Sequence, residues 1–226
     1  MVRRIGFFSI RDWKVVTWLI WINVIFSSIA LILWALYPDS IKYFALNPAN
    51  ILHGKYIWTL ITHMFVHGGI GHLLVNMIVL FSLGGLSEKI LGRKRFLWFY
   101  LISGLFAGLL SVVLSGFFGY GVWERVFGGA DLFMVGASGA IFAIAGLYVV
   151  LLPRLKFMII FLPFFSFPAY IIIPGALVVM WGLSIFAGWP IGNVAHFGGF
   201  LSGIVYGLYL KGKYPRKIRM LRRMIR

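Results

Sequence analysis

Hydrophobic residues form long runs along this chain, separated by shorter polar stretches. The runs cover residues 15–37, 70–87, 95–117, 136–152, 169–187 and 194–210. A run of about 17 to 25 apolar residues is long enough to cross the roughly 30 Å hydrocarbon layer of a bilayer as a helix. The pattern therefore predicts an all-α membrane protein, built as a bundle of six transmembrane helices with both termini on one side.

The composition supports this fold class. Of 226 residues, 62% are hydrophobic and 12% are charged, which is more apolar than a water-soluble core can bury. We expect one membrane domain at 15–210, between a cytoplasmic segment at 1–14 and a basic cytoplasmic tail at 211–226. The first run is too long for a signal-peptide core and should remain as a span. The chain has no cysteine, so disulfides and thiol catalysis are excluded.

The net charge of +16 would favour nucleic-acid binding in a soluble protein, but the placement of the charges indicates membrane topology instead. Lys and Arg gather at both termini and in alternate loops, and the other loops contain only Lys42, Lys55 and Arg125. The positive-inside rule then predicts a multi-pass protein of the cell membrane with cytoplasmic N- and C-termini. We expect no nucleic-acid partner.

Three shorter segments also carry predictions. Residues 38–69 are rich in aromatic and aliphatic side chains, so we expect them to lie in the headgroup region and pack on the bundle. The apolar run at 157–167 is too short to span and is predicted to lie along the inner face.

The tail contains an apolar stripe with i, i+3, i+7 spacing, which suits a helix resting on anionic lipid. The alternative is a frayed basic tail. The stripe consists of Ile218, Leu221 and Ile225.

Several polar residues are predicted at one depth in the bilayer. The stretch from Ser138 to the end of its run has 15 residues and rises about 22 Å, which leaves Ser138 about 8 Å inside the outer hydrocarbon boundary. The run that starts at His196 has the same length and direction. His72 shares this level, and Asn76 lies one turn deeper on the same helix face.

Small residues predict close packing of the fourth and sixth spans. Gly199 and Gly203 continue a four-residue glycine repeat, which lets membrane helices approach closely. The fourth span carries Gly136 and Gly139 around Ser138. We expect the resulting contact to bring the imidazole of His196 within reach of the Ser138 hydroxyl.

This arrangement suits hydrolysis by a serine nucleophile. Ser138 needs a base, for which His196 is placed, and the chain has no acidic residue in the spans near that histidine, so we expect a Ser-His dyad. Backbone N–H groups at the helix start, the ring of His72 and the amide of Asn76 are candidate oxyanion donors. Phe142, four residues after Ser138, is predicted to stack on the imidazole.

The small and polar residues around Ser138 also suit roles other than catalysis. Small residues around Ser138 also suit ordinary helix packing, and polar intramembrane side chains also stabilise bundles by hydrogen bonds. The i, i+4 spacing of His63 and His67 raises metal binding, but the His-Glu-x-x-His pattern of zinc proteases is missing. We interpret both histidines as structural or interfacial and expect neither metal nor cofactor.

Several motifs resemble, in order, those of the rhomboid family of intramembrane serine proteases. They are Trp58, His63, His67-Gly68-Gly69, His72-Leu73-Leu74-Val75-Asn76, Gly84-Gly85 with Glu88, Gly136-Ala137-Ser138-Gly139 and Ala195-His196-Phe197-Gly198-Gly199. The resemblance implies a six-helix rhomboid-like bundle without a cofactor. It also implies Ser138 as nucleophile, His196 as general base, and His72, Asn76 and the Ser138 amide as oxyanion stabilisers.

The resemblance further implies that the partners are the lipid bilayer and single-span membrane proteins, which enter sideways near the fifth span as substrates. A gate there is expected to involve Trp181, Phe186 and Trp189. This chain departs from the family pattern in two places, with Thr59 where Arg usually follows Trp58 and with Phe142 where Tyr often stacks on the histidine.

Two other functions remain as alternatives. A rhomboid-like protein can bind membrane helices without cutting them, and the presence of both Ser138 and His196 favours the enzyme over this possibility. A small transporter or channel needs polar groups along a path through the whole bilayer. Here the predicted polar layer is confined to the outer third, which disfavours transport.

Overall fold

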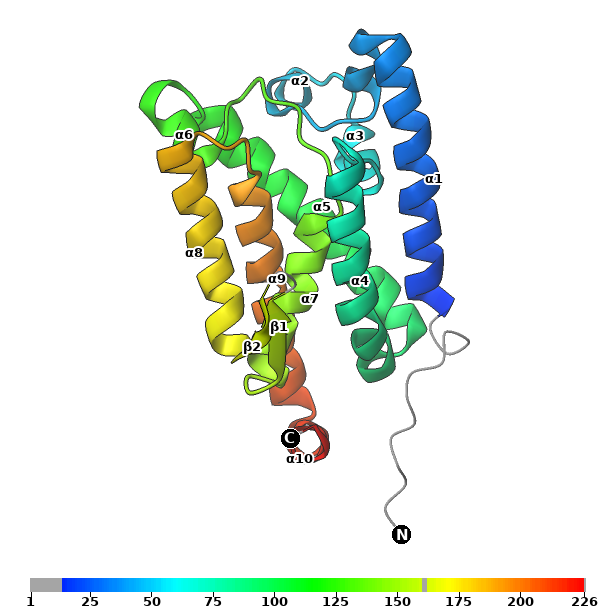
Figure 1. Cartoon of the computed structure of the whole chain (residues 1–226), viewed down its shortest axis with the longest axis vertical. Coiled ribbons are helices and arrows are strands. Elements are labelled where there is room, and N and C mark those ends of the chain that lie inside the picture. The colour runs from blue at the N-terminus through cyan, green and yellow to red at the C-terminus, as the bar shows by residue number, and fades with distance from the viewer. Residues whose placement is uncertain (1–13, 160–161, 226) are drawn as a thin grey trace.

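The computed structural model describes residues 14–159 and 162–225, and it is mostly helical (Figure 1). The predicted N-terminal segment 1–14 lies outside these residues except for Lys14. Long helices occupy every predicted apolar run. They are α1 (Lys14–Leu36), α4 (Ile70–Leu91), α5 (Arg93–Phe118), α7 (Ser138–Leu151), α8 (Ala169–Ala187) and α9 (Asn193–Lys213).

By length and composition, α1, α4, α5 and α8 can each cross a membrane. α7 is apolar but has 14 residues and rises about 21 Å. α9 ends with Lys211 and Lys213 in its last turn. The chain is therefore a membrane protein, whereas the number of six crossings and the side on which the termini lie stay predictions.

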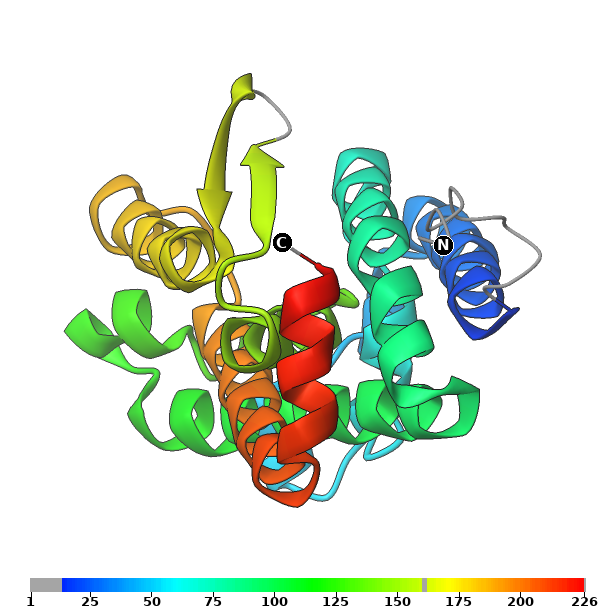
Figure 2. The same ribbon diagram turned by 90° about the horizontal axis from the view of Figure 1, so that it is seen from below.

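α7 lies at the centre of the bundle and packs against α4, α5, α8 and α9 (Figures 1 and 2). Nearly all of its side chains are buried, including Ile144, Leu147 and Tyr148. α4, α7 and α9 all begin at one end of the molecule, which we call the site end (Figure 1). The opposite end carries Arg93 and Lys211 among other cations, and we call it the basic end.

Buried polar contacts join the outer helices to this centre. Glu88 in α4 accepts hydrogen bonds from the first backbone N–H groups of α1, at 3.3 Å from Val15 and 3.0 Å from Val16. Helix N-termini have unpaired N–H groups, which a carboxylate stabilises. Tyr148 of α7 accepts a 2.8 Å hydrogen bond from Ser87. These contacts fix α1 on α4 and α4 on α7.

The segment between α1 and α4 contains short helices that pack on α1 and α5. They are η2 (Pro38–Tyr43), α2 (Pro48–Leu52), α3 (Thr59–Thr62) and η3 (His63–Phe65). The indole of Trp58 donates to the carbonyl oxygen of Tyr43 at 3.0 Å. The hydroxyl of Thr62 donates to the carbonyl oxygen of Phe44 at 3.1 Å. The predicted packing of this segment is confirmed, and its place in the headgroup region stays a prediction.

Between α5 and α7 the chain forms η4 (Gly121–Trp123) and α6 (Glu124–Phe127) at the site end (Figure 1). After α7 it forms an antiparallel hairpin of β1 (Lys156–Ile159) and β2 (Leu162–Pro168). Figure 1 shows both strands beside the ends of α7 and α8 nearest the basic end. The short run that was predicted to lie along the inner face thus forms a hairpin, and its place relative to the membrane stays a prediction. Aromatic and β-branched residues favour strands, and proline disfavours a helix interior.

The tail forms α10 (Pro215–Met224), which crosses beneath α7 and α9 (Figure 2). Its apolar stripe packs on the protein core, with Ile218 buried and Leu221 partly buried. Arg222 donates to the last carbonyl oxygens of α7, at 2.7 Å from Val150 and 2.9 Å from Leu151. The tail is thus a helix, and the expectation that its apolar stripe rests on lipid is wrong, because the open end of the bundle covers that stripe.

Candidate active site

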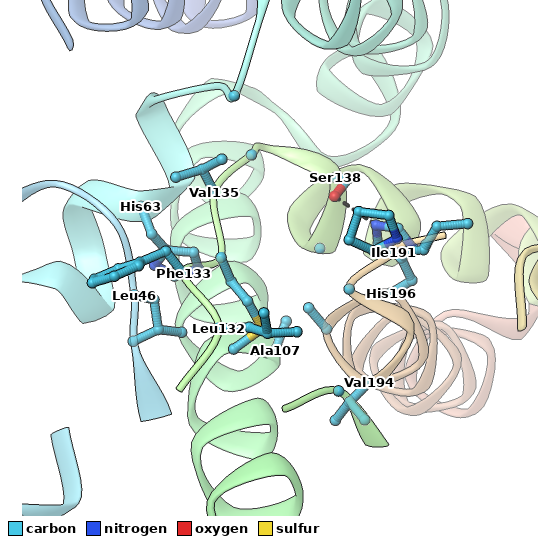
Figure 3. Close-up of a pocket in the computed structure, with 18 of the residues that line it drawn as sticks. Leu46, His63, Ala107, Leu132, Phe133, Val135, Ser138, Ile191, Val194 and His196 are labelled. Carbon is cyan, nitrogen blue, oxygen red and sulfur yellow. Dashed lines mark hydrogen bonds between the residues drawn. The ribbon is translucent and has the colours of Figure 1, made fainter. Parts of the chain in front are cut away.

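The structure brings Ser138 and His196 together at the site end (Figure 3). Ser138 is the first residue of α7, His196 lies in the first turn of α9, and Oγ and Nε2 are 2.7 Å apart. When the hydroxyl donates this hydrogen bond, Nε2 is the acceptor and the proton of the neutral ring lies on Nδ1. This is the arrangement in which a histidine can take the proton of a serine.

The surroundings of His196 hold the ring in place without an acidic residue. The phenyl ring of Phe142 stacks on the imidazole, with ring centroids 4.7 Å apart and an interplanar angle of 28°. Nδ1 of His196 is buried and has no hydrogen-bond partner among the described residues. Among the described residues, the pair of Ser138 and His196 therefore has no carboxylate bonded to the ring, and the stacked phenyl ring restrains the imidazole instead.

The distance between serine and histidine depends on close backbone contact between α7 and α9. A side-chain carbon at Gly199 would overlap the carbonyl oxygen of Gly139, and one at Gly203 would overlap that of Ala143. From the other side, a carbon at Gly146 would overlap the carbonyl oxygen of Phe200. No larger residue fits at these contacts without moving the helices apart. The glycine repeat thus sets the separation of the two reactive side chains.

The chain enters α7 through a tight turn that needs glycine. Gly136 has φ +127°, a conformation that other residues rarely adopt. Its N–H donates to the carbonyl oxygen of His63 at 2.8 Å. A side-chain carbon at Gly136 would also lie 3.0 Å from the imidazole of His72. The glycine therefore presents Ser138 and lets His72 come close.

Donors for an oxyanion surround the serine. The first N–H groups of α7, starting at Ser138, have no carbonyl partner within the helix. Asn76 is buried, and its Nδ2 donates to the carbonyl oxygen of His72 at 3.1 Å, which leaves a second amide hydrogen. His72 and Asn76 line one hollow together with Ser138 and His196. The structure thus places every predicted oxyanion group beside the dyad.

Two hollows meet at the dyad, and Ser138, His196, His72 and Met180 line both. The first, which we call the site cavity, has a volume of about 650 Å³ and lies toward α6 and the α8–α9 connection (Figure 3). The second, which we call the lateral groove, has a volume of about 480 Å³ and lies between α4 and α8. Its apolar walls extend to β1.

The site also contains a buried chain of hydrogen bonds that was not predicted. Nδ1 of His67 and Oγ of Ser27 in α1 are 2.9 Å apart, and the Ala137 N–H donates to Nε2 of His67 at 3.4 Å. Burial and, to a lesser extent, the nearby His72 lower the pKa of His67 to about 3, so the ring stays neutral. The chain ties α1 to the residue before Ser138. His67 was noted only as structural, and no sequence pattern marked Ser27.

The predicted gate residues lie in different places. Trp189 lines the site cavity, whereas Phe186 is 88% exposed on the surface. The indole of Trp181 donates to the carbonyl oxygen of Val126 at 2.7 Å and its ring lies against Phe197. Trp181 therefore joins α8 to α6 and α9 and does not line the lateral groove. Met180 takes the position next to the dyad.

The two histidines considered for a metal site have other hydrogen-bond partners, which for His67 are Ser27 and the Ala137 N–H and for His63 a backbone carbonyl. Nδ1 of His63 lies 2.8 Å from the carbonyl oxygen of Thr59, and burial lowers the pKa of His63 to about 4. Across residues 14–159 and 162–225, no three His, Asp or Glu side chains come together as a metal-binding group.

Comparison with known proteins agrees with this geometry. The sequence matches the Rhomboid domain over residues 54–213, which is more than half of the chain, so the protein belongs to the rhomboid family. The human presenilin-associated rhomboid-like protein, mitochondrial, is 32% identical over 171 residues, covering 75% of this chain and 41% of that protein. RHOMBOID-like protein 7 of Arabidopsis thaliana is 30% identical over 168 residues, covering 74% of this chain and 47% of that protein.

The chain spans less than half the length of these curated relatives. The first relatives are named as mitochondrial proteins, and the Arabidopsis relatives carry no location in their names. Membership of the family and of the class of membrane proteins is shown.

Proposed function

We propose that this protein is an intramembrane serine endopeptidase that hydrolyses peptide bonds in or near the transmembrane segments of single-span membrane proteins. The observation that carries the proposal is the 2.7 Å contact between Ser138 Oγ and His196 Nε2 at the junction of a cavity and a lateral groove. Packing alone does not require a nucleophile, a base and oxyanion donors to meet at one point.

In the first half-reaction, Oγ of Ser138 attacks the scissile carbonyl carbon while Nε2 of His196 takes its proton. The carbonyl oxygen becomes an oxyanion, which the N–H groups at the start of α7 and the side chains of Asn76 and His72 stabilise. The imidazolium then gives its proton to the departing amine, and the acyl group stays on Ser138.

In the second half-reaction, a water molecule gives a proton to His196 as its oxygen attacks the acyl carbon. The tetrahedral intermediate collapses, the proton returns to Oγ of Ser138, and the carboxylic acid product leaves. The site cavity supplies water to this step, since it is lined by connecting loops at the end of the bundle. The stacked ring of Phe142 keeps His196 in one orientation throughout.

A substrate helix must unwind before it reacts, because a helix keeps its carbonyl groups in its own hydrogen bonds. The lateral groove offers an apolar route for such a segment from the lipid to the dyad. Substrates with glycine, proline or other weak helix formers near the level of Ser138 are therefore preferred. Replacing those residues with leucine in a cleaved substrate should slow cleavage.

The distribution of Lys and Arg supports six crossings with both termini on the cytoplasmic side of the cell membrane. This part of the proposal has a direct test, because the chain contains no cysteine. A single cysteine at Val122, which is 83% exposed near the site end, should react with an impermeant maleimide added to intact cells. A cysteine at Gly212 should react only after the membrane is opened, and the reverse pattern would contradict the topology.

The test of activity uses purified protein in liposomes with a single-span reporter. Ser138→Ala and His196→Ala should each lower cleavage by about 10³-fold or more. Ser111→Ala is the matched control, because Ser111 is also buried but bonds only to the carbonyl oxygen of Ala107 in its own helix. Cleavage that survives Ser138→Ala would refute the nucleophile. A wild-type protein that binds the reporter and never cuts it would support the helix-binding alternative.

A further inference from the structure

The hairpin between α7 and α8 has no role in the proposed chemistry, yet it borders the groove that leads to the dyad. Phe157 and Met158 of β1 line the lateral groove together with Ser138 and His196. The ring of Phe157 also lies against Tyr148 of α7, with centroids 6.0 Å apart. The hairpin is therefore joined to the core at the end of the groove nearest the basic end.

The groove runs along an edge of β1. Successive side chains of a strand point to opposite faces, so the neighbours Phe157 and Met158 can line one groove only if it borders the strand edge. One edge of β1 is paired with β2. Figure 2 shows β1 on the side of the hairpin that faces α4, with β2 on the side of α8. The free edge of β1 therefore faces the groove.

The backbone groups on this free edge need a partner. Within the described part of the chain, no backbone hydrogen bond links β1 residues to any element but β2. The sequence 157–167 contains no charged residue, and Figure 1 shows β1 and β2 beside the ends of the apolar helices α7 and α8. Open strand edges do not persist in contact with hydrocarbon, because N–H and C=O groups cannot bond to lipid tails.

We propose that the unwound transmembrane segment of a substrate adds to the free edge of β1 as a third strand. Backbone pairing of this kind gives affinity with little demand on side-chain identity. It also satisfies the N–H and C=O groups that the substrate exposes when its helix opens. This inference rests on the proposed protease function for the nature of the occupant, but the pairing itself does not require cleavage.

The geometry indicates which substrate residues pair with β1. Ser138 and Tyr148 are separated by about 15 Å along α7, since each helical residue rises about 1.5 Å. An extended chain covers that distance in about five residues. Pairing should therefore begin about five residues from the scissile bond, on the side toward the basic end.

The test uses the whole 226-residue chain, which contains no cysteine. Met158, whose side chain is 69% exposed, is changed to cysteine in a Ser138→Ala background so that a single-span reporter stays intact. Reporters with a single cysteine at successive positions around the expected pairing site are then oxidised in liposomes. Disulfide yield should alternate, several-fold stronger at every second position, because a paired strand presents every second side chain to the same face.

Two further variants complete the design. Val79→Cys, on the α4 wall of the groove, reports whether the reporter enters, and Val205→Cys, 60% exposed on α9, reports random collision. Two patterns of disulfide yield at Met158→Cys would overturn the proposal. A maximum at every third or fourth reporter position would mean that the reporter is helical there, and a yield that does not vary with position would mean a disordered chain. Disulfides at Val79→Cys without any at Met158→Cys would overturn the proposal, and so would a lack of disulfides at both.

Cleavage of the same reporter by the wild-type protein separates this proposal from the protease proposal. Cleavage without an alternating disulfide pattern would refute strand pairing and leave the enzyme intact. An alternating pattern without cleavage would support strand pairing and refute the enzyme.

Discussion

The two sides of α7 are built in opposite ways. Toward α9, glycines bring the backbones so close that a side-chain carbon at Gly199 or Gly203 would overlap a carbonyl oxygen. On the other side, the lateral groove separates α4 from α8, and a side-chain carbon at Gly175 or Gly182 of α8 would meet nothing within 4 Å. We call these the tight side and the open side.

The contrast between the tight side and the open side explains how a small bundle can fix reacting groups in place and still admit a large partner. Proton transfer between Ser138 and His196 requires that their reacting atoms stay within hydrogen-bond distance. The helices that carry them, α7 and α9, are accordingly in close backbone contact. A transmembrane segment needs room to enter from the lipid, so α4 and α8, which flank the groove, are not packed closely on each other.

The largest effect is expected where the tight side is broken. Gly203→Val places a branched side chain against the backbone of Ala143, so α7 and α9 must separate. Overpacking costs about 1–3 kcal/mol or more, and the dyad loses its geometry as well. We expect a lower melting temperature in detergent and loss of reporter cleavage.

The matched control for Gly203→Val is Gly182→Val on the open side, where the side chain meets no neighbour within 4 Å. It should keep the melting temperature within a few degrees of that of the wild type. Equal damage from the two substitutions would contradict the distinction between the tight side and the open side.

The next effect concerns oxyanion stabilisation. Asn76→Ala removes an amide donor beside Ser138 and should lower kcat by about 10²-fold, with a small change in KM. Ser82→Ala is the control, since Ser82 lines the same groove but donates to the carbonyl oxygen of Ile78 in its own helix. Steady-state kinetics on the reporter measure both. A kcat for Asn76→Ala equal to that of Ser82→Ala would remove Asn76 from the oxyanion group.

A substitution on the open side should separate substrate entry from chemistry. Ala176→Phe puts a ring into the lateral groove, where it takes space that the substrate needs. Reporter cleavage should fall by about tenfold, which corresponds to roughly 1.4 kcal/mol of lost binding free energy. Labelling of Ser138 by a small fluorophosphonate should stay near the wild-type rate. Val178→Phe, at a position 72% exposed, is the control. A parallel fall in labelling and cleavage would mean that the ring disturbs the dyad rather than the entry route.

A smaller effect is expected at the far end of α7. Arg222→Gln removes charged donors from the last carbonyl groups of α7. The lost hydrogen bonds should cost about 1 kcal/mol and lower the melting temperature by a few degrees. Arg219→Gln, on the exposed face of α10, should change little. A melting temperature for Arg222→Gln equal to that of Arg219→Gln would show that α10 does not stabilise the tight side.

The last prediction is a pH dependence of stability. The folded protein holds the pKa of His67 at about 3, below its usual value of 6.5, so folding favours the neutral ring. Stability from this group is complete above pH 6.5 and is lost as the pH falls from there toward 3. The melting temperature should fall between pH 7 and pH 4, and it should fall less in His67→Gln. An identical slope in the two proteins would assign the effect to other groups, such as His63.

The sequence alone allowed much of the site to be predicted. Equal run lengths placed Ser138, His196 and His72 at one level, because a helix rises by a constant amount per residue. The glycine spacing predicted the contact of α7 with α9, since a four-residue repeat lines one helix face. The stacking of Phe142 followed from its position one turn after Ser138. All of these are regularities within single helices.

Other features had no local pattern. The bond between Ser27 and His67 joins residues 40 positions apart, and a lone serine in an apolar run carries no sign of its partner. Glu88 was noted in a motif, but its hydrogen bonds to the start of α1 depend on where two helices meet. The strands of the hairpin at 156–168 were not predicted, because short apolar runs have no period that distinguishes a strand from other conformations.

From the sequence came the class of protein, the positions of the long helices and the pairing of Ser138 with His196, because hydrophobic length and helical rise are local properties of the chain. The tertiary structure alone decided the separation of the reacting atoms, the network around Ala137, the packing of the tail on α7 and the open groove beside β1. Each of these depends on the distances between elements that are remote in sequence, and such distances result from the packing of the whole bundle.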